Sequence, residues 1–380
     1  MTSKSVRSEA QNRTGGDPSR LTAQASRTLM IMAGGTGGHI FPALSVAEHV
    51  RAAGWNVVWL GSRGGMEARI VPPKGYPMAW LRFSGLRRKG PFAVAMLPLN
   101  LLIAFWQSAR AIFTHRPDVI LGMGGYVAFP GGMMASFLNR PLVIHEQNSV
   151  AGLTNRVLGR VADQVLVGFP DAFGKRPKAQ WTGNPVRAEI ANIAGPDERF
   201  AQRTGPLRVL VLGGSQGAKA LNDTVPQALA LMLQDALPDV IHQAGAAHLE
   251  SVRANYAAVG IAATIVPFIE DMAASYAAAD VMICRAGAST IAELAAAGVP
   301  SVLVPFPFAV DDHQTHNARF LAERGGAVLI PQQELTPERL AQLLRELTRD
   351  QLLAMARAAR SAGKPDATRE VAEVCMRMAA

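Results

Sequence analysis

The chain has 380 residues, 49% of them hydrophobic and 18% charged, a composition typical of a folded protein too long for one ordinary hydrophobic core. Its net charge of +9 is compatible with an anionic partner, but there is no lysine-rich tract or zinc-finger pattern, which argues against nucleic acid. The two cysteines, Cys284 and Cys375, form no metal-ligand pattern and indicate a cytosolic protein without disulfides.

Residues 1–27 are polar and basic and lack the apolar segment of a secretory signal, so we expect a flexible extension. Beyond it, apolar strand-like runs alternate with helix-length segments, which predicts parallel α/β sheets. Strands are expected in the first half at 29–33, 56–60, 119–122, 142–145 and 164–167. In the second half they are expected at 209–212, 240–243, 263–266, 281–284, 301–304 and 327–330.

Each half of the chain opens in the same way, with an apolar strand, a glycine-rich turn and a helix. This restart predicts two doubly wound domains rather than one large sheet. The turn-rich Gly183-Asn184-Pro185 marks the junction, so the domains are expected to span 28–185 and 186–362. Residues 363–380 are expected to form a helix that packs back on the first domain.

Three glycine-rich loops, each directly after a predicted strand, have the character of phosphate-binding turns: 34–38, 122–126 and 213–216. Glycines let backbone N–H groups approach phosphate oxygens, and the start of the following helix adds partial positive charge. The alternative is that these glycines only form tight turns between strand and helix. Three such loops in one chain favour phosphate binding.

The glycine loops do not match the two common nucleotide-binding patterns. The dinucleotide fingerprint fails because Ile40 stands at the third glycine position, and no acidic residue follows the strand that ends at Leu60. The P-loop fails because Ala218-Lys219-Ala220 stands where Gly-Lys-Ser/Thr is required. A phosphate site without either pattern points to nucleotide-sugar chemistry.

A further turn, Arg285–Thr290, precedes an alanine-rich helix whose start Ser289 and Thr290 are expected to cap. Glu293 lies one helical turn further on, where a carboxylate can bind the diol of a sugar. The same position also suits a glutamate that stabilises the helix start through a capping box or the helix dipole.

A set of short motifs from about Thr28 onward resembles the MurG family of glycosyltransferases. The ordered set is far more specific than any single glycine loop, and it covers nearly the whole chain. Its members are Met32–His39, Gly122–Tyr126, His145–Asn148, Gly183–Arg187, Gly213–Gly217, Phe268–Met272, Arg285–Glu293 and Asp311–Gln314. The resemblance implies the α/β GT-B fold, in which two Rossmann-like doubly wound domains face each other across a cleft.

Members of this family add N-acetylglucosamine to the lipid-linked muramyl-pentapeptide precursor of peptidoglycan. The resemblance implies an inverting hexosyltransferase that uses UDP-N-acetylglucosamine and undecaprenyl-diphospho-muramyl-pentapeptide (lipid I) to make lipid II. Two alternatives are a related GT-B transferase for another glycolipid or natural product, and a nucleotide-sugar-binding protein without turnover. Because no Asp-x-Asp pattern is present, no obligatory metal is expected, and no cofactor is implied.

The resemblance also implies roles for individual residues. His39 is the first candidate for the general base, because it follows the first glycine loop and an imidazole titrates near neutral pH; a structural histidine would look the same. Glu146 is the second candidate. The acceptor diphosphate would lie against Gly34, Gly35, Gly124, Gly125 and Tyr126. The donor would contact Thr36, Gly37, Gly38, Asn148, Arg187, Ser215, Ile269, Ala288, Ser289, Thr290, Ile291, Ala292, Glu293 and Gln314, with Arg187 and Ser215 on the diphosphate, Ile269 on uracil and Glu293 on the ribose.

The most apolar stretch, 92–106, is flanked by basic residues and is too short to span a bilayer, which takes roughly 20 apolar residues. Such a segment suits contact with an anionic membrane surface, although a buried core helix has the same pattern. The lipid-linked acceptor favours the membrane, with contacts from Phe92, Leu97, Arg87, Arg88 and Lys89. The enzyme would then be a peripheral protein on the cytoplasmic face of the bacterial inner membrane, with other cell-wall synthesis proteins as further partners.

Overall fold

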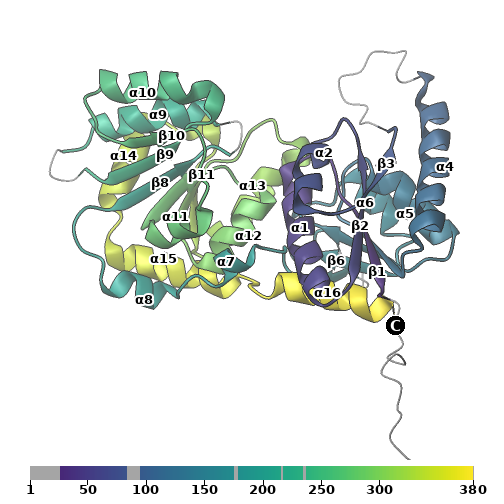
Figure 1. Cartoon of the computed structure of the whole chain (residues 1–380). Helices are drawn as coiled ribbons and strands as arrows, with labels where there is room; N and C mark the ends of the chain where they lie inside the picture. The colour runs from purple at the N-terminus through teal and green to yellow at the C-terminus, as the bar shows by residue number, and fades with distance from the viewer. Residues whose placement is uncertain (1–25, 84–94, 175–178, 215–216, 234–236, 380) are drawn as a thin grey trace, which may run out of the picture.

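Two parallel β-sheets organise the computed structural model, which describes residues 26–83, 95–174, 179–214, 217–233 and 237–379 (Figure 1). The first sheet has seven strands in the order β3-β2-β1-β4-β5-β6-β7, and the second has six in the order β10-β9-β8-β11-β12-β13. In each sheet the strand order changes direction beside the first strand, between β1 and β4 and between β8 and β11. Doubly wound proteins bind ligands at this switch point, beyond the carboxyl ends of the strands.

The strands agree closely with the sequence-based prediction, since every predicted strand is present and its ends differ by at most two residues. The edge strands β3 and β7 were not predicted, because they are short and also only partly buried, unlike the equally short strands inside the sheets. The first sheet consists of β1 (Thr28–Met32), β2 (Asn56–Ser62), β3 (Met78–Leu81), β4 (Val119–Gly122), β5 (Leu142–Glu146), β6 (Gln164–Val167) and β7 (Ala179–Trp181). The second consists of β8 (Arg208–Leu212), β9 (Asp239–Gln243), β10 (Thr264–Val266), β11 (Val281–Cys284), β12 (Ser301–Leu303) and β13 (Ala327–Leu329).

The helices connect successive strands and cover both sheets. Among the described residues, no helix is long and apolar enough to cross a bilayer. Around the first sheet lie α1 (Gly37–Ala52), α2 (Glu67–Ile70), η2 (Pro72–Lys74), α4 (Leu97–His115), α5 (Ala128–Phe137), α6 (Leu153–Leu158) and α16 (Ala367–Met378). The others are α7 (Ala188–Ala191), α8 (Pro196–Ala201), α9 (Lys219–Ala230), η4 (Ala246–His248), α10 (Leu249–Ala258), α11 (Met272–Ala278), α12 (Ala288–Ala297), η5 (Val310–Asp312), α13 (His313–Ala322), η6 (Gln332–Glu334), α14 (Pro337–Glu346) and α15 (Arg349–Ala362).

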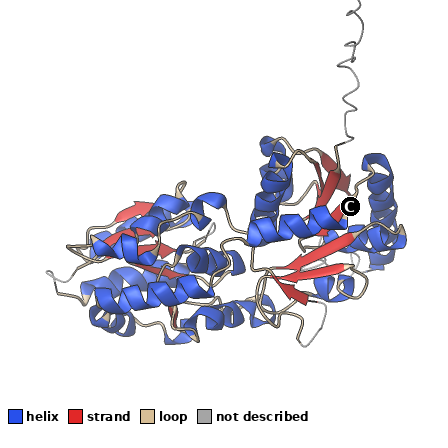
Figure 2. Ribbon diagram, turned by 90° about the horizontal axis from the view of Figure 1, so that it is seen from below, coloured by secondary structure: helices blue, strands red, loops and turns tan. Residues whose placement is uncertain are grey.

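Each sheet is buried on both faces, which explains its continuous apolar strands. Successive residues of β1 point to opposite sides, so Ile31 packs with α1 and α16, whereas Met30 and Met32 pack with α4 and α5. Helices on both sides of the strands are visible in Figure 2. Because helices cover both faces, only the strand ends and their loops are free to form a site.

The last helix, α16, packs against α1 and β4 of the first sheet, whereas the preceding helix, α15, packs against α12 and α8 of the second domain (Figure 1). Its side chains Val371 and Cys375 are buried in the core between α1 and β1. Thr368 Oγ1 also donates to the carbonyl oxygen of Val186 at 2.7 Å. The chain therefore passes between the two sheets at two neighbouring places, after β7 and again after α15.

Candidate active site

Two of the glycine loops meet at the carboxyl end of the first sheet. Gly125 has a positive φ of 82°, and a methyl group at this position would lie 2.2 Å from the carbonyl oxygen of Gly34. A Cβ at Gly124 would come within 3.0 Å of the His39 ring. Only glycine allows the two backbones and the imidazole to approach so closely.

Helix α1 begins directly at the first loop, with Thr36 as its N-cap residue. The first helical bonds run from His39 N and Ile40 N to the Thr36 carbonyl, so the N–H groups of Gly37 and Gly38 precede the helical ladder. Unpaired N–H groups and the helix dipole favour an anion at such a helix start. The structure thus places His39 beside a site suited to phosphate.

A buried carboxylate that the sequence analysis did not identify supports this loop from below. Glu67 is fully buried and accepts from Gly35 N at 3.1 Å and from Ser62 N at 2.9 Å. Both carboxylate oxygens are therefore committed to backbone N–H groups. Glu67 fixes the shape of the loop and occupies the Gly35 N–H in this state.

Glu146, at the end of β5, also has an ordered set of partners. Its Oε1 accepts from Asn148 N at 2.9 Å, and its Oε2 accepts from Asn155 Nδ2 at 2.9 Å and Gly152 N at 3.1 Å. The side chain is 2% exposed. These bonds hold the loop after β5 and leave Glu146 little freedom to receive a proton from a substrate.

In the second domain, a pocket of about 690 Å³ opens beyond the carboxyl ends of β8 and β11. It is lined in part by Gly213, Gly214, Gly287, Thr290 and Gln314. Ser215, expected at the donor diphosphate, lies outside the described residues. Of the predicted donor residues, Thr290 and Gln314 line this pocket at the switch point.

The start of α12 differs from the expected capping arrangement. The N-cap residue is Gly287, whereas Ser289 and Thr290 lie inside the first turn and do not cap the helix. The helix begins at Ala288, before the hydroxyl side chains that the sequence suggested as caps. Among the described residues, the buried Ser289 Oγ has no hydrogen-bond partner.

Glu293, one turn into α12, is held by two side chains from other elements. Arg187 Nη2 lies 3.1 Å from its Oε1, and Tyr276 donates from its hydroxyl to Oε2 at 2.9 Å. Burial raises the pKa of Glu293, while Arg187 and Tyr276 act in the opposite direction. The arrangement presents a buried, oriented carboxylate beside the pocket. The role of Tyr276 was not predicted, because only the packing of α11 against α12 brings its hydroxyl to Glu293.

Ile269, Ala288 and Ile291 belong to one buried apolar cluster of the second domain. Gln314 lies in the first turn of α13, where its Oε1 accepts from Phe306 N at 3.0 Å and Ala286 N at 3.3 Å. Gln314 therefore connects the loops after β11 and β12, which both contribute to the lining of the pocket.

The two domains are joined by Asn317, a fully buried residue that the sequence analysis missed. Its Oδ1 accepts from Ser149 N at 2.9 Å and from Ser149 Oγ at 2.8 Å. Its Nδ2 lies 3.4 Å from Asn148 Oδ1. Asn317 follows Gln314 by three residues, so both lie on one face of α13; that spacing was the available signal. Asn148 is thereby placed at the boundary between the domains.

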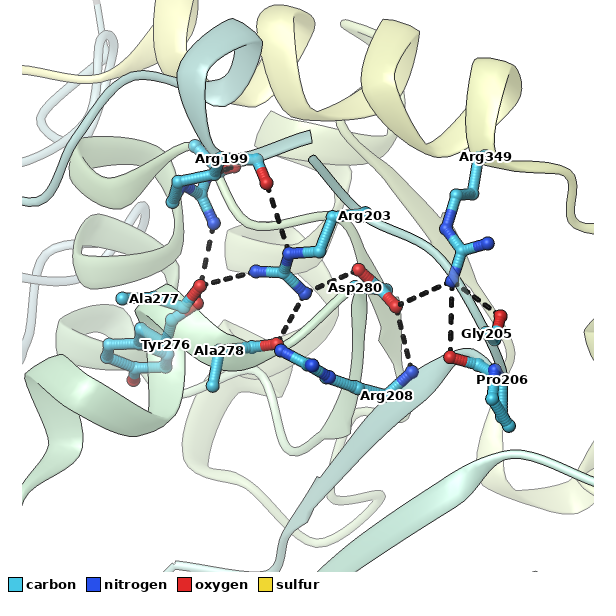
Figure 3. A network of polar contacts seen from close by, with 11 residues as sticks. Arg199, Arg203, Gly205, Pro206, Arg208, Tyr276, Ala277, Ala278, Asp280 and Arg349 are labelled. Carbon is cyan, nitrogen blue, oxygen red and sulfur yellow. Dashed lines mark hydrogen bonds and ion pairs between the residues drawn. The ribbon is translucent and has the colours of Figure 1, made fainter. Parts of the chain in front are cut away.

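At the amino ends of β8 and β11, opposite to the donor pocket, a cluster of arginines surrounds the fully buried Asp280 (Figure 3). Arg203 Nη1 lies 2.6 Å from Asp280 Oδ1, Arg208 N donates to Oδ2 at 2.9 Å, and Arg349 lies 3.8 Å away. Burial lowers the pKa of Arg203, and Asp280 acts in the opposite direction. The same cluster reaches the carboxyl ends of α11 and α12, where Arg203 and Arg199 donate to the last carbonyl groups.

Comparison with known protein families agrees with this geometry. The model of the glycosyltransferase family 28 N-terminal domain matches residues 29–167. The model of the glycosyltransferase family 28 C-terminal domain matches residues 208–371. The two matches fall on the two sheets described above.

Full-length relatives are also highly similar. A protein of Dechloromonas aromatica (strain RCB) is 60% identical over 354 residues, covering 93% of this chain and 99% of the relative. A protein of Ralstonia nicotianae is 59% identical over 360 residues, covering 94% and 98%. Both are named UDP-N-acetylglucosamine--N-acetylmuramyl-(pentapeptide) pyrophosphoryl-undecaprenol N-acetylglucosamine transferase.

The crystal structure of Acinetobacter baumannii MurG superposes on this chain with a TM-score of 0.80 and 40% sequence identity. The match covers 92% of this chain and 99% of that one, so both domains share the GT-B architecture. The fold, the ordered loops and the similarity over almost the full length agree, and the chain belongs to the MurG family within glycosyltransferase family 28.

Proposed function

We propose that this protein transfers N-acetylglucosamine from UDP-N-acetylglucosamine to the 4-hydroxyl group of the muramyl sugar in undecaprenyl-diphospho-muramyl-pentapeptide. The observation that carries the proposal is that each domain has a glycine loop suited to binding an anion. The two domains are connected across their boundary by the hydrogen bonds between Asn317 and Ser149. One loop set suits a donor diphosphate and the other an acceptor diphosphate. The relatives of similar length carry the name of this activity.

The donor is proposed to lie in the second-domain pocket. Glu293 would accept hydrogen bonds from the ribose hydroxyls, and its buried carboxylate is already oriented by Tyr276. Arg187, now paired with Glu293, would turn to the diphosphate, where a guanidinium binds phosphate oxygens well. The unpaired Ser289 hydroxyl and the start of α12 offer further polar contacts to the nucleotide.

The acceptor is proposed to place its diphosphate at the loops Gly34–Gly38 and Gly124–Tyr126, with its 4-hydroxyl near His39. The hydroxyl oxygen attacks the anomeric carbon of the donor sugar, the bond from that carbon to the phosphate oxygen breaks, and UDP leaves. His39 takes the hydroxyl proton as this happens. We prefer His39 to Glu146 as the base, because both oxygens of Glu146 already accept bonds from their own loop.

The activity can be tested directly with radiolabelled UDP-N-acetylglucosamine and a lipid-linked muramyl-pentapeptide analogue. Transfer of label to this acceptor is the expected result. Transfer only to another glycolipid or natural product would favour the related GT-B transferase. UDP binding without transfer to any acceptor would favour a nucleotide-sugar-binding protein.

A first prediction concerns the donor carboxylate. Glu293→Ala should weaken UDP binding about 10- to 100-fold, because a hydrogen bond to a charged group contributes roughly 1.5–3 kcal/mol. Tyr276→Phe should weaken it less, by about 2- to 10-fold, since the carboxylate stays but loses one orienting bond. Calorimetric titration with UDP measures both. Glu346→Ala, an exposed change on α14, is the control, and equal UDP affinity in all variants would remove Glu293 from the ribose site.

We also propose that the protein contacts the anionic cytoplasmic face of the bacterial inner membrane through α4. One face of this helix exposes Leu102 by 66%, Trp106 by 61% and Phe113 by 61%, and Arg110 lies over the Trp106 ring. Apolar side chains edged by a cation suit the interface of an anionic bilayer. Leu97 is half-buried at the start of α4, whereas the other predicted contacts, Phe92, Arg87, Arg88 and Lys89, lie outside the described residues.

The membrane proposal predicts a loss of vesicle binding in the double variant Trp106→Glu with Phe113→Glu. Sedimentation with phosphatidylglycerol vesicles should show binding weaker by at least about 100-fold, because each of the two buried apolar side chains contributes roughly 1.5–3 kcal/mol. Leu233→Glu is the matched control, since Leu233 is 70% exposed on the second domain. If the double variant kept full binding and a normal melting temperature, α4 would not be the contact.

A further inference from the structure

A chain of hydrogen bonds runs inward from His39 through two side chains that are almost completely buried. His39 Nδ1 lies 2.8 Å from Gln147 Oε1, and Gln147 Nε2 lies 3.1 Å from His145 Nδ1. His145 Nε2 lies 2.9 Å from the carbonyl oxygen of Gly183. His145 is fully buried and Gln147 is 1% exposed, so solvent does not compete for these bonds.

The direction of each bond follows from its inner end. The Gly183 carbonyl can only accept, so His145 Nε2 carries a proton and donates it. Burial lowers the pKa of His145 to about 4, which leaves the ring neutral near pH 7 and its Nδ1 free to accept. Gln147 Nε2 therefore donates to His145 Nδ1, and it also faces the His145 carbonyl oxygen at 3.2 Å. That second acceptor fixes which end of the amide points inward.

This orientation turns the Gln147 oxygen outward to His39. An amide oxygen only accepts, so the proton of a neutral His39 ring must stand on Nδ1. The lone pair then lies on Nε2, the nitrogen that points away from Gln147. We propose that Gln147 is a positioning residue that holds His39 as the Nδ1–H tautomer and thereby presents Nε2 to the acceptor hydroxyl. This inference rests on the proposed role of His39 as the base.

The nearby carboxylates do not orient the His39 ring, which leaves its orientation to Gln147. The nearby carboxylates, Glu67 and Glu146, are both committed to hydrogen bonds with their own loops. Among the described residues, Gln147 is the hydrogen-bonding partner found for the His39 ring. A general base held by a polar neighbour in one tautomer is a common arrangement in enzymes, and loss of the neighbour leaves the base misdirected.

The inner end of the chain lies where the backbone leaves the first sheet. Gly183 has a positive φ of 81°, and a Cβ there would lie 2.3 Å from the Lys364 side chain, so the position requires glycine. The next residue, Asn184, donates from its Nδ2 to the Gln147 carbonyl at 2.9 Å. Gln147 is thus fixed at its side chain and at its backbone by the segment that leads into the second domain.

Kinetics of two variants test the proposal. Gln147→Met keeps the volume but removes the acceptor, and it should lower kcat about 10- to 100-fold, the cost typical of a misplaced catalytic group. UDP affinity should stay within about twofold of the wild type, as expected for a site that does not share contacts. Gln147→Glu keeps an oxygen toward His39 and, as the protonated acid, can still donate from its other oxygen to His145 Nδ1, so below the pKa of the new carboxyl group it should recover part of the lost rate. If Gln147 only filled space, Met would be tolerated better than Glu, and that result would overturn the proposal.

A double-variant cycle provides the control. In a His39→Ala background, Gln147→Met should cost no more than about twofold further in kcat, because its effect passes through His39. Loss of the full single-variant factor in that background would show that Gln147 acts independently of His39. Melting temperatures and UDP titrations verify that each variant is folded.

The tautomer itself can be read without turnover. The protein has eight histidines, so it is labelled with ¹⁵N-histidine and the NMR chemical shifts of the imidazole nitrogens are measured. The signal of His39 is the one that is absent from the His39→Ala spectrum. The expected wild-type signal is that of a ring protonated at Nδ1, and Gln147→Met should mix the two tautomers. A wild-type ring protonated at Nε2 would overturn the positioning role. A correct tautomer in a protein that transfers no sugar would instead overturn the proposed function.

Discussion

Replacing His39 by alanine is expected to lower kcat by about 100- to 10,000-fold, the range that a positioned general base contributes. The attacking hydroxyl must lose its proton as the new bond forms, and the nearby carboxylates Glu67 and Glu146 already accept hydrogen bonds from their own loops. The affinity for UDP should change little, because Glu293 and Arg187 stand on elements of the second domain. Single-turnover rates at saturating donor separate this chemical effect from product release.

The control for this prediction is His49→Ala, the same change near the carboxyl end of α1. The His49 side chain is half-buried and lies outside the site. It should leave kcat unchanged. A His39→Ala enzyme with near-normal turnover would eliminate His39 as the base. A loss of UDP affinity equal to the loss of rate would mean that His39 acts on the donor instead.

The parallel sheets could be predicted because strands buried on both faces are apolar throughout their length. Met30, Ile31 and Met32 show this directly, since neighbouring residues enter different cores. At β8 a second apolar strand is followed by a glycine-rich turn and a helix, and this repeat predicted a second domain. Edge strands such as β7, with the sequence Ala179-Gln180-Trp181, lack this double burial and resemble loops.

The parts of the candidate site that bind through backbone N–H groups could be predicted from the sequence. The parts that depend on contacts between distant side chains could not. Glycine loops after strands are local features, so the loops at Gly34 and Gly124 were found. Glu67, Tyr276 and Asn317 were missed because their partners are distant in sequence, as with Asn317 and Ser149. The motif around His145 was noticed, but only the fold shows that Gln147 connects His145 to His39.

Asp280→Ala should be the most destabilising single change in the second domain. It would leave the buried guanidinium of Arg203 and the backbone N–H of Arg208 without their acceptor. Removing one partner of a buried ion pair typically costs about 3–5 kcal/mol. Arg349, which also bonds Gly205 and Pro206, stays anchored, so α15 should remain in place while the ends of β8 and α11 loosen.

Unfolding in urea can assign this loss to one domain. Four of the five tryptophans, Trp55, Trp59, Trp80 and Trp106, lie within the first domain, and Trp181 lies at its boundary against Phe320 of α13, so tryptophan fluorescence reports mainly the first domain. Far-UV circular dichroism reports the helices of both domains. Asp280→Ala should move the dichroism transition to lower urea and leave the fluorescence transition nearly in place. As a control, Glu250→Ala removes an ion pair whose carboxylate side chain is 81% exposed, and should move neither transition.

The same variant should also weaken UDP binding, although Asp280 does not line the donor pocket. Arg199 and Arg203 donate to carbonyl groups at the carboxyl ends of α12 and α11, and these helices carry Glu293 and Tyr276. Asp280 holds Arg203 in position for its bonds to α11, so the loss of Asp280 would disorder α11 from its carboxyl end. Asp280→Asn keeps an oxygen for Arg203 and should recover part of both the stability and the affinity. Lowered stability with unchanged UDP affinity would mean that the donor site is held by the contacts of Glu293 alone.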